Sequence, residues 1–79
     1  MTRRDIMVVP MNLVQEGSIV EVKSITKKSD LVKRLSELGI VSGNKVKVIK
    51  NDGRSLIVAI EESRFALDNM LAKNIMVVN

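Results

Sequence analysis

Apolar and polar residues alternate along two segments of the chain, which is the pattern of a β-strand with one buried face. The first segment, residues 18–25, is rich in β-branched side chains and alternates from Val20 onward. The second segment, residues 45–50, places Val46 and Val48 on one face and lysines on the other. Each segment therefore predicts a half-buried strand.

Between these segments the apolar period changes from two residues to three or four, which predicts an α-helix. Ser29 or Asp30 can cap its N-terminus by accepting a hydrogen bond from a free backbone N–H group. Gly39 can adopt the left-handed conformation that commonly ends a helix. The apolar residues at helical spacing are Leu31, Val32, Leu35 and Leu38.

The second half of the chain predicts further short strands separated by turns. Residues 51–53, Asn-Asp-Gly, favour a tight hairpin because these residue types tolerate positive φ angles. The return strand, residues 56–60, is apolar on both faces and is expected to be central in the sheet. The remaining expected elements are a turn at 61–64, a strand at 65–67, a helical turn at 68–72 capped by Asp68, a closing strand at 75–78 and an extra strand around 11–14.

Five or six short strands with one inserted helix predict a mainly β, or α+β, fold built as a small, strongly bent β-barrel. The chain has 79 residues, of which 46% are hydrophobic, so it can bury one core and form one domain. We expect residues 1–10 to be an N-terminal segment, flexible in part, and residues 11–79 to be the barrel domain.

The composition narrows the chemistry that is available to the chain. It contains no histidine and no cysteine, so carboxylates alone would have to hold a metal ion. The carboxylates fall in surface and turn contexts, and the glycines form no phosphate-binding motif. We therefore expect no catalytic residues, no metal site and no cofactor, and we do not expect an enzyme.

The chain shows no segment that predicts membrane insertion. No run of apolar residues approaches the roughly 20 needed to cross a bilayer. The apolar run at residues 6–9 follows two arginines but is too short for the hydrophobic region of a signal peptide. Together with the absence of cysteine, which suits a reducing compartment, these features predict a cytoplasmic protein.

These features also occur in the order and spacing of a known family, and the chain resembles the FeoA family over residues 11–79. The most specific piece is the helix end at residues 34–40, which precedes a glycine turn and an alternating strand. Ser42 departs from the family pattern, since members commonly carry proline there, and the hairpin loop at 51–53 is shorter than in many members. The residues that carry the resemblance are Leu13, Gly17, Val20, Val22, Leu31, Leu35-Ser36-Glu37-Leu38-Gly39-Ile40, Gly43, Val46, Val48, Leu56, Val58, Ile60, Arg64-Phe65-Ala66-Leu67, Ala72 and Ile75-Met76-Val77-Val78.

The resemblance implies an SH3-like barrel that serves as a small cytoplasmic accessory or regulatory protein of bacterial ferrous iron uptake. It implies protein–protein interaction with the FeoB permease, at the permease's cytoplasmic G domain. Similar domains form the C-terminal part of iron-dependent repressors. Those proteins require a helix-turn-helix domain upstream, so we do not expect a repressor.

The candidate partner-binding surface lies on the helix and at its C-terminal end. Charged residues on the outer face lie beside an apolar helix end, and such a mixed patch can dock on a partner. The alternative is a solvated helix face, held by i, i+4 ion pairs. Arg34 or Arg64 could also present a cation to a GTP-binding partner. The candidate residues are Lys33, Arg34, Glu37, Leu38, Gly39 and Ile40.

The net charge of +4 keeps a nucleic-acid-binding small β-barrel as the alternative function. Phe65 is the one aromatic residue of the sequence, and its place in a strand favours a core role over base stacking. Nucleic acid is therefore disfavoured as a partner. A weak homo-oligomer stays open, because a barrel edge such as the strand at 75–78 could pair with another copy.

Overall fold

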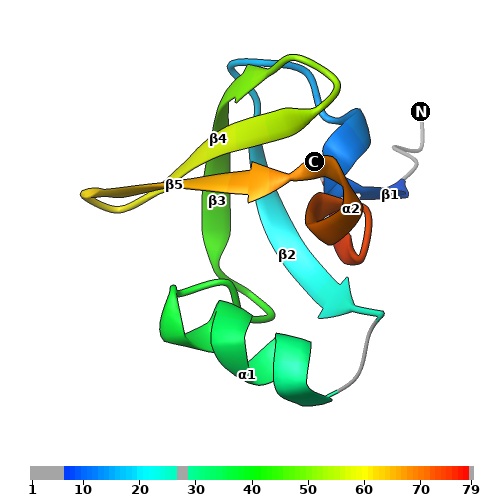
Figure 1. Ribbon diagram of the computed structural model, residues 1–79, viewed down its shortest axis with the longest axis vertical. Helices are drawn as coiled ribbons and strands as arrows, with labels where there is room; N and C mark the ends of the chain where they lie inside the picture. The colour runs from blue at the N-terminus through cyan, green and yellow to red at the C-terminus, as the bar shows by residue number, and fades with distance from the viewer. Residues whose placement is uncertain (1–6, 27–28, 79) are drawn as a thin grey trace, which may run out of the picture.

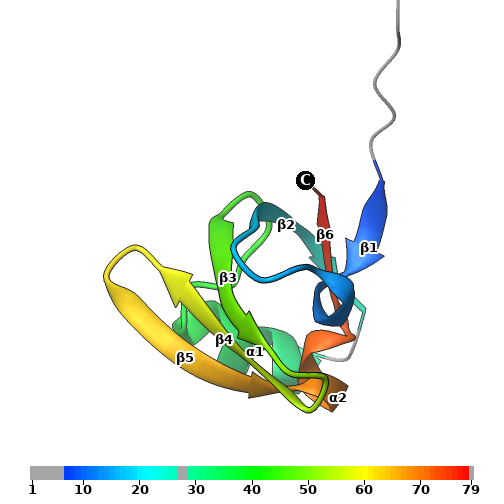
Figure 2. The same ribbon diagram turned by 90° about the horizontal axis from the view of Figure 1, so that it is seen from above.

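The chain folds as one bent antiparallel sheet with two short helices, seen in a computed structural model that describes residues 7–26 and 29–78 (Figure 1). The strand order is β1-β6-β2-β3-β4-β5, so β1 and β5 are the two edges. Viewed from above, the sheet curls around its core without closing (Figure 2). The elements are β1 (Val8–Pro10), the 3-10 helix η1 (Met11–Leu13), β2 (Ile19–Ile25), α1 (Ser29–Glu37), β3 (Lys45–Asn51), β4 (Ser55–Ile60), β5 (Ser63–Asp68), α2 (Asn69–Ala72) and β6 (Ile75–Val78).

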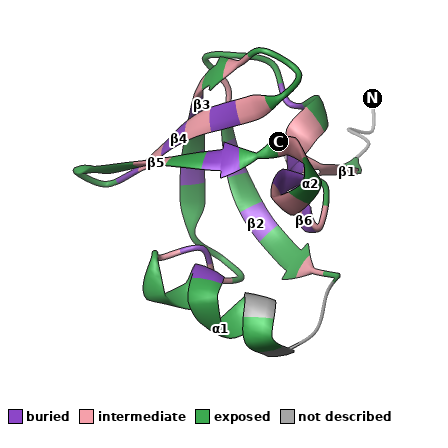
Figure 3. Cartoon of the chain, in the orientation of Figure 1, coloured by how far each residue is buried: buried purple, intermediate pink, exposed green. Residues whose placement is uncertain are grey.

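The alternation of apolar and polar residues in the sequence matches the alternation of buried and exposed residues along the strands. Inward-facing residues of β2, β3, β4 and β6 are buried, and their neighbours along each strand are exposed or half-buried (Figure 3). Full burial of one such side chain contributes about 1.5–3 kcal/mol. No polar side chain is buried in the described part of the chain. The buried core is Met11, Val14, Val20, Val22, Leu35, Ile40, Val46, Val48, Leu56, Val58, Ile60, Leu67, Ala72, Ile75 and Val77.

The N-terminal part of the sheet differs from the expectation. The extra strand expected around residues 11–14 is wrong, since residues 11–13 form η1 and the strand is β1. Pro10, with φ of −65°, lacks an N–H group and is tolerated at the end of an edge strand, where it turns the chain into η1. The sheet thus begins before residue 11, where we expected the barrel domain to start.

The closing strand β6 is interior rather than at an edge. It pairs with β1 on one side and β2 on the other, with Val77 opposite both Val9 and Val22. The expectation that residues 75–78 form an edge available to another copy is therefore wrong, because β1 covers them.

The predicted helix and the central strand are confirmed. Strand β4 lies between β3 and β5. Gly39 has φ of +97°, and the Ile40 N–H donates to the Leu35 carbonyl at 2.9 Å, which is the bond that closes a Schellman-type helix end. The predicted N-terminal cap rests on the Ser29 and Asp30 side chains, and the placement of the Ser29 side chain lies outside the described residues.

The β3–β4 hairpin is tied to the chain segment that follows η1. The Asn51 side chain donates to the carbonyls of Asn12 at 3.0 Å and Val14 at 2.9 Å. Its carbonyl oxygen accepts the Gly53 N–H at 3.1 Å, so one amide holds both the turn and the segment beside it.

We expect Asn51→Asp to lower the free energy of unfolding by about 1–3 kcal/mol, because the carboxylate cannot donate to the two partly buried carbonyls. Urea unfolding followed by circular dichroism measures the change. Asn44→Asp is the matched control, since Asn44 donates one exposed bond, to the Gly39 carbonyl. An equal loss in both variants would contradict the role assigned to Asn51.

Asp52 stabilises the same turn through its charge. Hydrogen bonds from the backbone N–H groups of Ser55 and Arg54 lower the pKa of the Asp52 carboxyl below its ordinary value of 3.8. A lowered pKa in the folded state stabilises the fold above pH 3.8, and this contribution is lost as the pH falls through the folded-state pKa.

We therefore expect Asp52→Asn to be less stable than the wild type at about pH 7 and to approach it at about pH 2. Paired urea titrations across this range measure the difference between the two proteins. A difference that is constant with pH would show that the Asp52 charge does not contribute.

Candidate functional site

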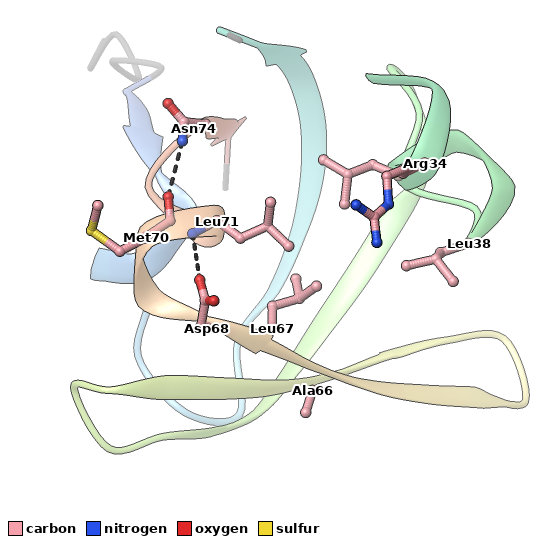
Figure 4. Close-up of a pocket in the computed structure, with 9 residues that line it drawn as sticks. Arg34, Leu38, Ala66, Leu67, Asp68, Met70, Leu71 and Asn74 are labelled. Atoms are coloured by element: carbon pink, nitrogen blue, oxygen red, sulfur yellow. Dashed lines mark hydrogen bonds between the residues drawn. The ribbon is translucent and has the colours of Figure 1, made fainter. Parts of the chain in front are cut away.

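An open groove of about 600 Å³ lies between α1 and the segment that runs from β5 into α2 (Figure 4). Leucines from both sides contribute to its apolar surface, and an arginine, an aspartate and an asparagine supply polar groups. The groove thus combines apolar walls with a few polar side chains, as binding sites commonly do. Its lining residues are Arg34, Leu35, Leu38, Ala66, Leu67, Asp68, Met70, Leu71 and Asn74.

Helix α1 and its C-terminal end form one wall. Arg34 and Leu38 are four residues apart and therefore lie on one face of this segment. Leu35 is buried and anchors the helix to the core, whereas Leu38 keeps 38% of its surface exposed. Figure 4 shows the Arg34 guanidinium reaching from α1 toward β5. The wall therefore presents a cation and an apolar side chain next to each other.

The opposite wall is held in place by two hydrogen bonds (Figure 4). Asp68 ends β5 and caps α2, because its carboxylate accepts the Leu71 N–H at 2.7 Å. The Asn74 side chain donates to the Met70 carbonyl at 2.9 Å and closes the other end of α2. The predicted helical turn with its Asp68 cap is thus confirmed. These bonds fix Leu71 at the groove.

The positive charge of Arg34 is not neutralised within the groove. Among residues 7–26 and 29–78, no carboxylate oxygen lies within 4.0 Å of the Arg34 guanidinium. Asp68 also lines the groove, where its Oδ1 accepts the Leu71 N–H and fixes its carboxylate on the opposite wall. A ligand that brings a carboxylate would therefore complement the wall that α1 forms.

The six candidate residues do not all belong to this groove. Arg34 and Leu38 line it, while Lys33 and Glu37 are exposed on α1 outside it. Gly39 is half-buried, and Ile40 is fully buried in the core. The structure therefore removes Ile40 from the surface patch: it follows the helix end that turns the chain inward. Partner binding by the other candidates stays a prediction.

Sequence reasoning missed the β5–α2 wall. The sequence predicts a short strand at 65–67 and a helical turn at 68–72, but nothing in their spacing places them opposite α1. That proximity depends on how far the sheet curls, which the alternation does not encode. Arg64, the other arginine considered for a GTP-binding partner, is exposed on β5 and is not among the groove residues.

The fold and its groove place the chain in the class of small SH3-like domains, and comparison with known proteins gives the family. The FeoA domain family matches residues 9–79. A Methanocaldococcus jannaschii protein named "Putative Fe(2+) transport protein A" is 37% identical over 68 residues, which cover 86% of this chain and 83% of that protein. The chain belongs to the FeoA family.

Solved structures agree with this assignment. An iron uptake regulatory protein, FeoA, superposes with a TM-score of 0.85 at 26% identity, covering 90% of this chain and 96% of that one. Zinc-bound FeoA of Stenotrophomonas maltophilia, described as a prokaryotic SH3 domain protein, gives a TM-score of 0.75 at 28% identity, covering 90% and 88% of the two chains. A manganese-dependent transcriptional repressor shares the fold alone, with a TM-score of 0.81 at 19% identity; 91% of this chain matches 41% of that one.

Two further observations concern metals and membranes. In the described ranges, no three acidic, histidine or cysteine side chains come together in a way that could hold a metal ion. Neither described helix has the length and apolar character needed to span a bilayer.

We expect Asp68→Ala to lower the stability of the domain by about 1 kcal/mol, because α2 loses its N-terminal cap. Thermal and urea unfolding measure the loss. Asp68→Asn is the matched control, since its amide oxygen can still accept the Leu71 N–H and should keep most of the stability. An alanine variant as stable as the asparagine variant would show that the cap does not hold this wall.

Proposed function

We propose that this chain is a cytoplasmic, non-enzymatic accessory protein of ferrous iron uptake that binds the cytoplasmic G domain of a FeoB-type permease. Membership of the FeoA family supports this proposal. So do the name of the M. jannaschii relative and the description of S. maltophilia FeoA as a candidate ferrous iron transport activating factor. Because one relative is archaeal, the proposal is not restricted to bacteria.

The observation that carries the proposal is the groove with its unneutralised arginine. Binding energy in protein interfaces concentrates in a few well-packed positions, among which arginine is enriched. Arg34 lines the groove together with leucines from both walls, so a partner that covers the groove would remove both the cation and the apolar surface from water. A carboxylate on the partner would then pair with Arg34 in a dry environment, where the pair is strongest.

In this proposal the ferrous ion is the cargo of the permease and not a ligand of this chain. The sequence offers neither histidine nor cysteine for such an ion. The chain would act through contact alone, by favouring one conformation of its partner.

Calorimetric titration of the chain into the purified G domain of the permease from the same organism tests the proposal. We expect saturable one-to-one binding that Arg34→Glu weakens at least about tenfold, since reversal places two carboxylates face to face. Lys47→Glu is the matched control: it makes the same charge change at an exposed residue of β3 that does not line the groove, and should bind nearly as the wild type does.

A parallel titration into a single-stranded oligonucleotide tests the alternative function. No heat with the G domain, together with oligonucleotide binding that falls steeply with salt, would replace the proposal with nucleic-acid binding. Equal weakening by the two charge reversals would locate the effect in net charge and contradict the role of the groove.

A further inference from the structure

The outer edge of β5 carries backbone groups that no other strand uses. Strand β5 pairs with β4 alone, and Ile60 and Ser63 are partners across the two-residue turn of the β4–β5 hairpin. In such a hairpin the pair beside the turn and every second pair after it exchange hydrogen bonds. Phe65 therefore bonds to β4, whereas Ala66 points its N–H and C=O toward the free edge.

Two observations support this alternation. The Asn69 N–H donates to the Arg54 carbonyl at 2.8 Å. Arg54 and Asn69 are the next hydrogen-bonded pair of the β4–β5 ladder, just beyond the two strands. The backbone groups of Arg64 and Ala66 do not take part in the turn, loop and cap hydrogen bonds of the described residues. Both residues are exposed. Their N–H and C=O groups are thus available to an added strand.

The free edge of β5 borders the groove, whereas the other edge of the sheet, β1, is poorly suited to pairing with an added strand. Residues 66–68 of β5 line the groove opposite Arg34 and Leu38. Strand β1 has three residues and ends in Pro10, which has no N–H to donate. Strand β5 has six residues and contains no proline.

We propose that the free edge of β5 binds an extended segment of the protein partner as a seventh strand of the sheet, with a carboxylate of that segment directed at Arg34. Strand addition of this kind gains affinity from backbone hydrogen bonds and specificity from alternate side chains. This inference rests on the proposed function and defines the chemistry of the partner at the same groove.

Geometry and charge define the segment further. An added strand would lie about 4.8 Å from β5, and every second side chain would share the inner face with Leu67. Those side chains enter the groove, where Leu38 and Leu71 offer apolar contacts. Arg34 has no carboxylate within 4.0 Å among the described residues, so an acidic residue flanked by apolar ones fits the site.

Strand addition is tested by a substitution that removes the outward-pointing N–H group of residue 66 and changes little else. Ala66→Pro eliminates that group at an edge position where the sheet tolerates proline. Ala66→Val is the matched control, because it adds side-chain bulk but keeps the N–H; the Ala66 side chain points away from the groove in Figure 4. We expect the proline variant to bind the permease G domain at least about tenfold more weakly than the valine variant, with thermal unfolding confirming that both are folded.

Amide hydrogen exchange of the wild type gives an independent readout that does not depend on the proline variant folding. We expect the Ala66 amide to exchange rapidly in the free chain and at least about tenfold more slowly when the G domain is saturating. Phe65 should be protected in both states because it already bonds to β4.

Each outcome separates the inference from the function on which it rests. Equal binding by two folded Ala66 variants, or an Ala66 amide that stays unprotected in a saturated complex, overturns strand addition while leaving the accessory function intact. No binding by the wild type overturns both. Self-association of the free chain that Ala66→Pro abolishes, measured by sedimentation, would assign the edge to a second copy and overturn the proposal of a foreign segment.

Discussion

The structure depends on the need to bury one apolar face of a single sheet. The chain has 79 residues, and the part that the structure describes forms no second layer of comparable size, so the sheet must curl until its own alternate residues meet. Valines at the inner positions of β2, β3, β4 and β6 suit this arrangement, because β-branched side chains pack well on a pleated surface. The curling of the sheet brings β5 near α1, although β3 and β4 lie between them in the sequence.

Buried residues hold the C-terminal half of helix α1 against the curled sheet. Leu35 is buried, and Ile40 continues the core immediately after the helix end. A side chain on Gly39 would meet Ile60 at 3.4 Å, so the chain turns in close contact with β4. These contacts fix the C-terminal half of α1, while Leu38 keeps part of its surface exposed. The groove is therefore a consequence of packing: the C-terminal half of α1 is anchored to the core, and the groove separates it from β5.

The sequence predicted the helices and strands better than it predicted which of them lie side by side in the fold. The alternation at Val46 and Val48, the helix end at Gly39 and the Asp68 cap are local signals, and the structure confirms each of them. The interior position of β6 was missed because it depends on pairing with β1, which is distant in sequence. Only one wall of the groove was predicted. Arg34 and Leu38 share a helical face, which the sequence shows, but their position opposite Leu71 is set by the curvature of the whole sheet.

The division between core and groove also bears on how this fold can serve different proteins. The residues that maintain the sheet are buried and apolar, while Arg34, Leu38, Met70 and the edge of β5 are exposed. Substitutions at these exposed residues leave the core packing nearly unchanged, so the choice of partner can change without loss of the fold. The manganese-dependent repressor, which shares the fold at 19% identity, is consistent with this separation. What distinguishes the present chain is therefore to be sought in the charge and shape of the groove rather than in the sheet that supports it.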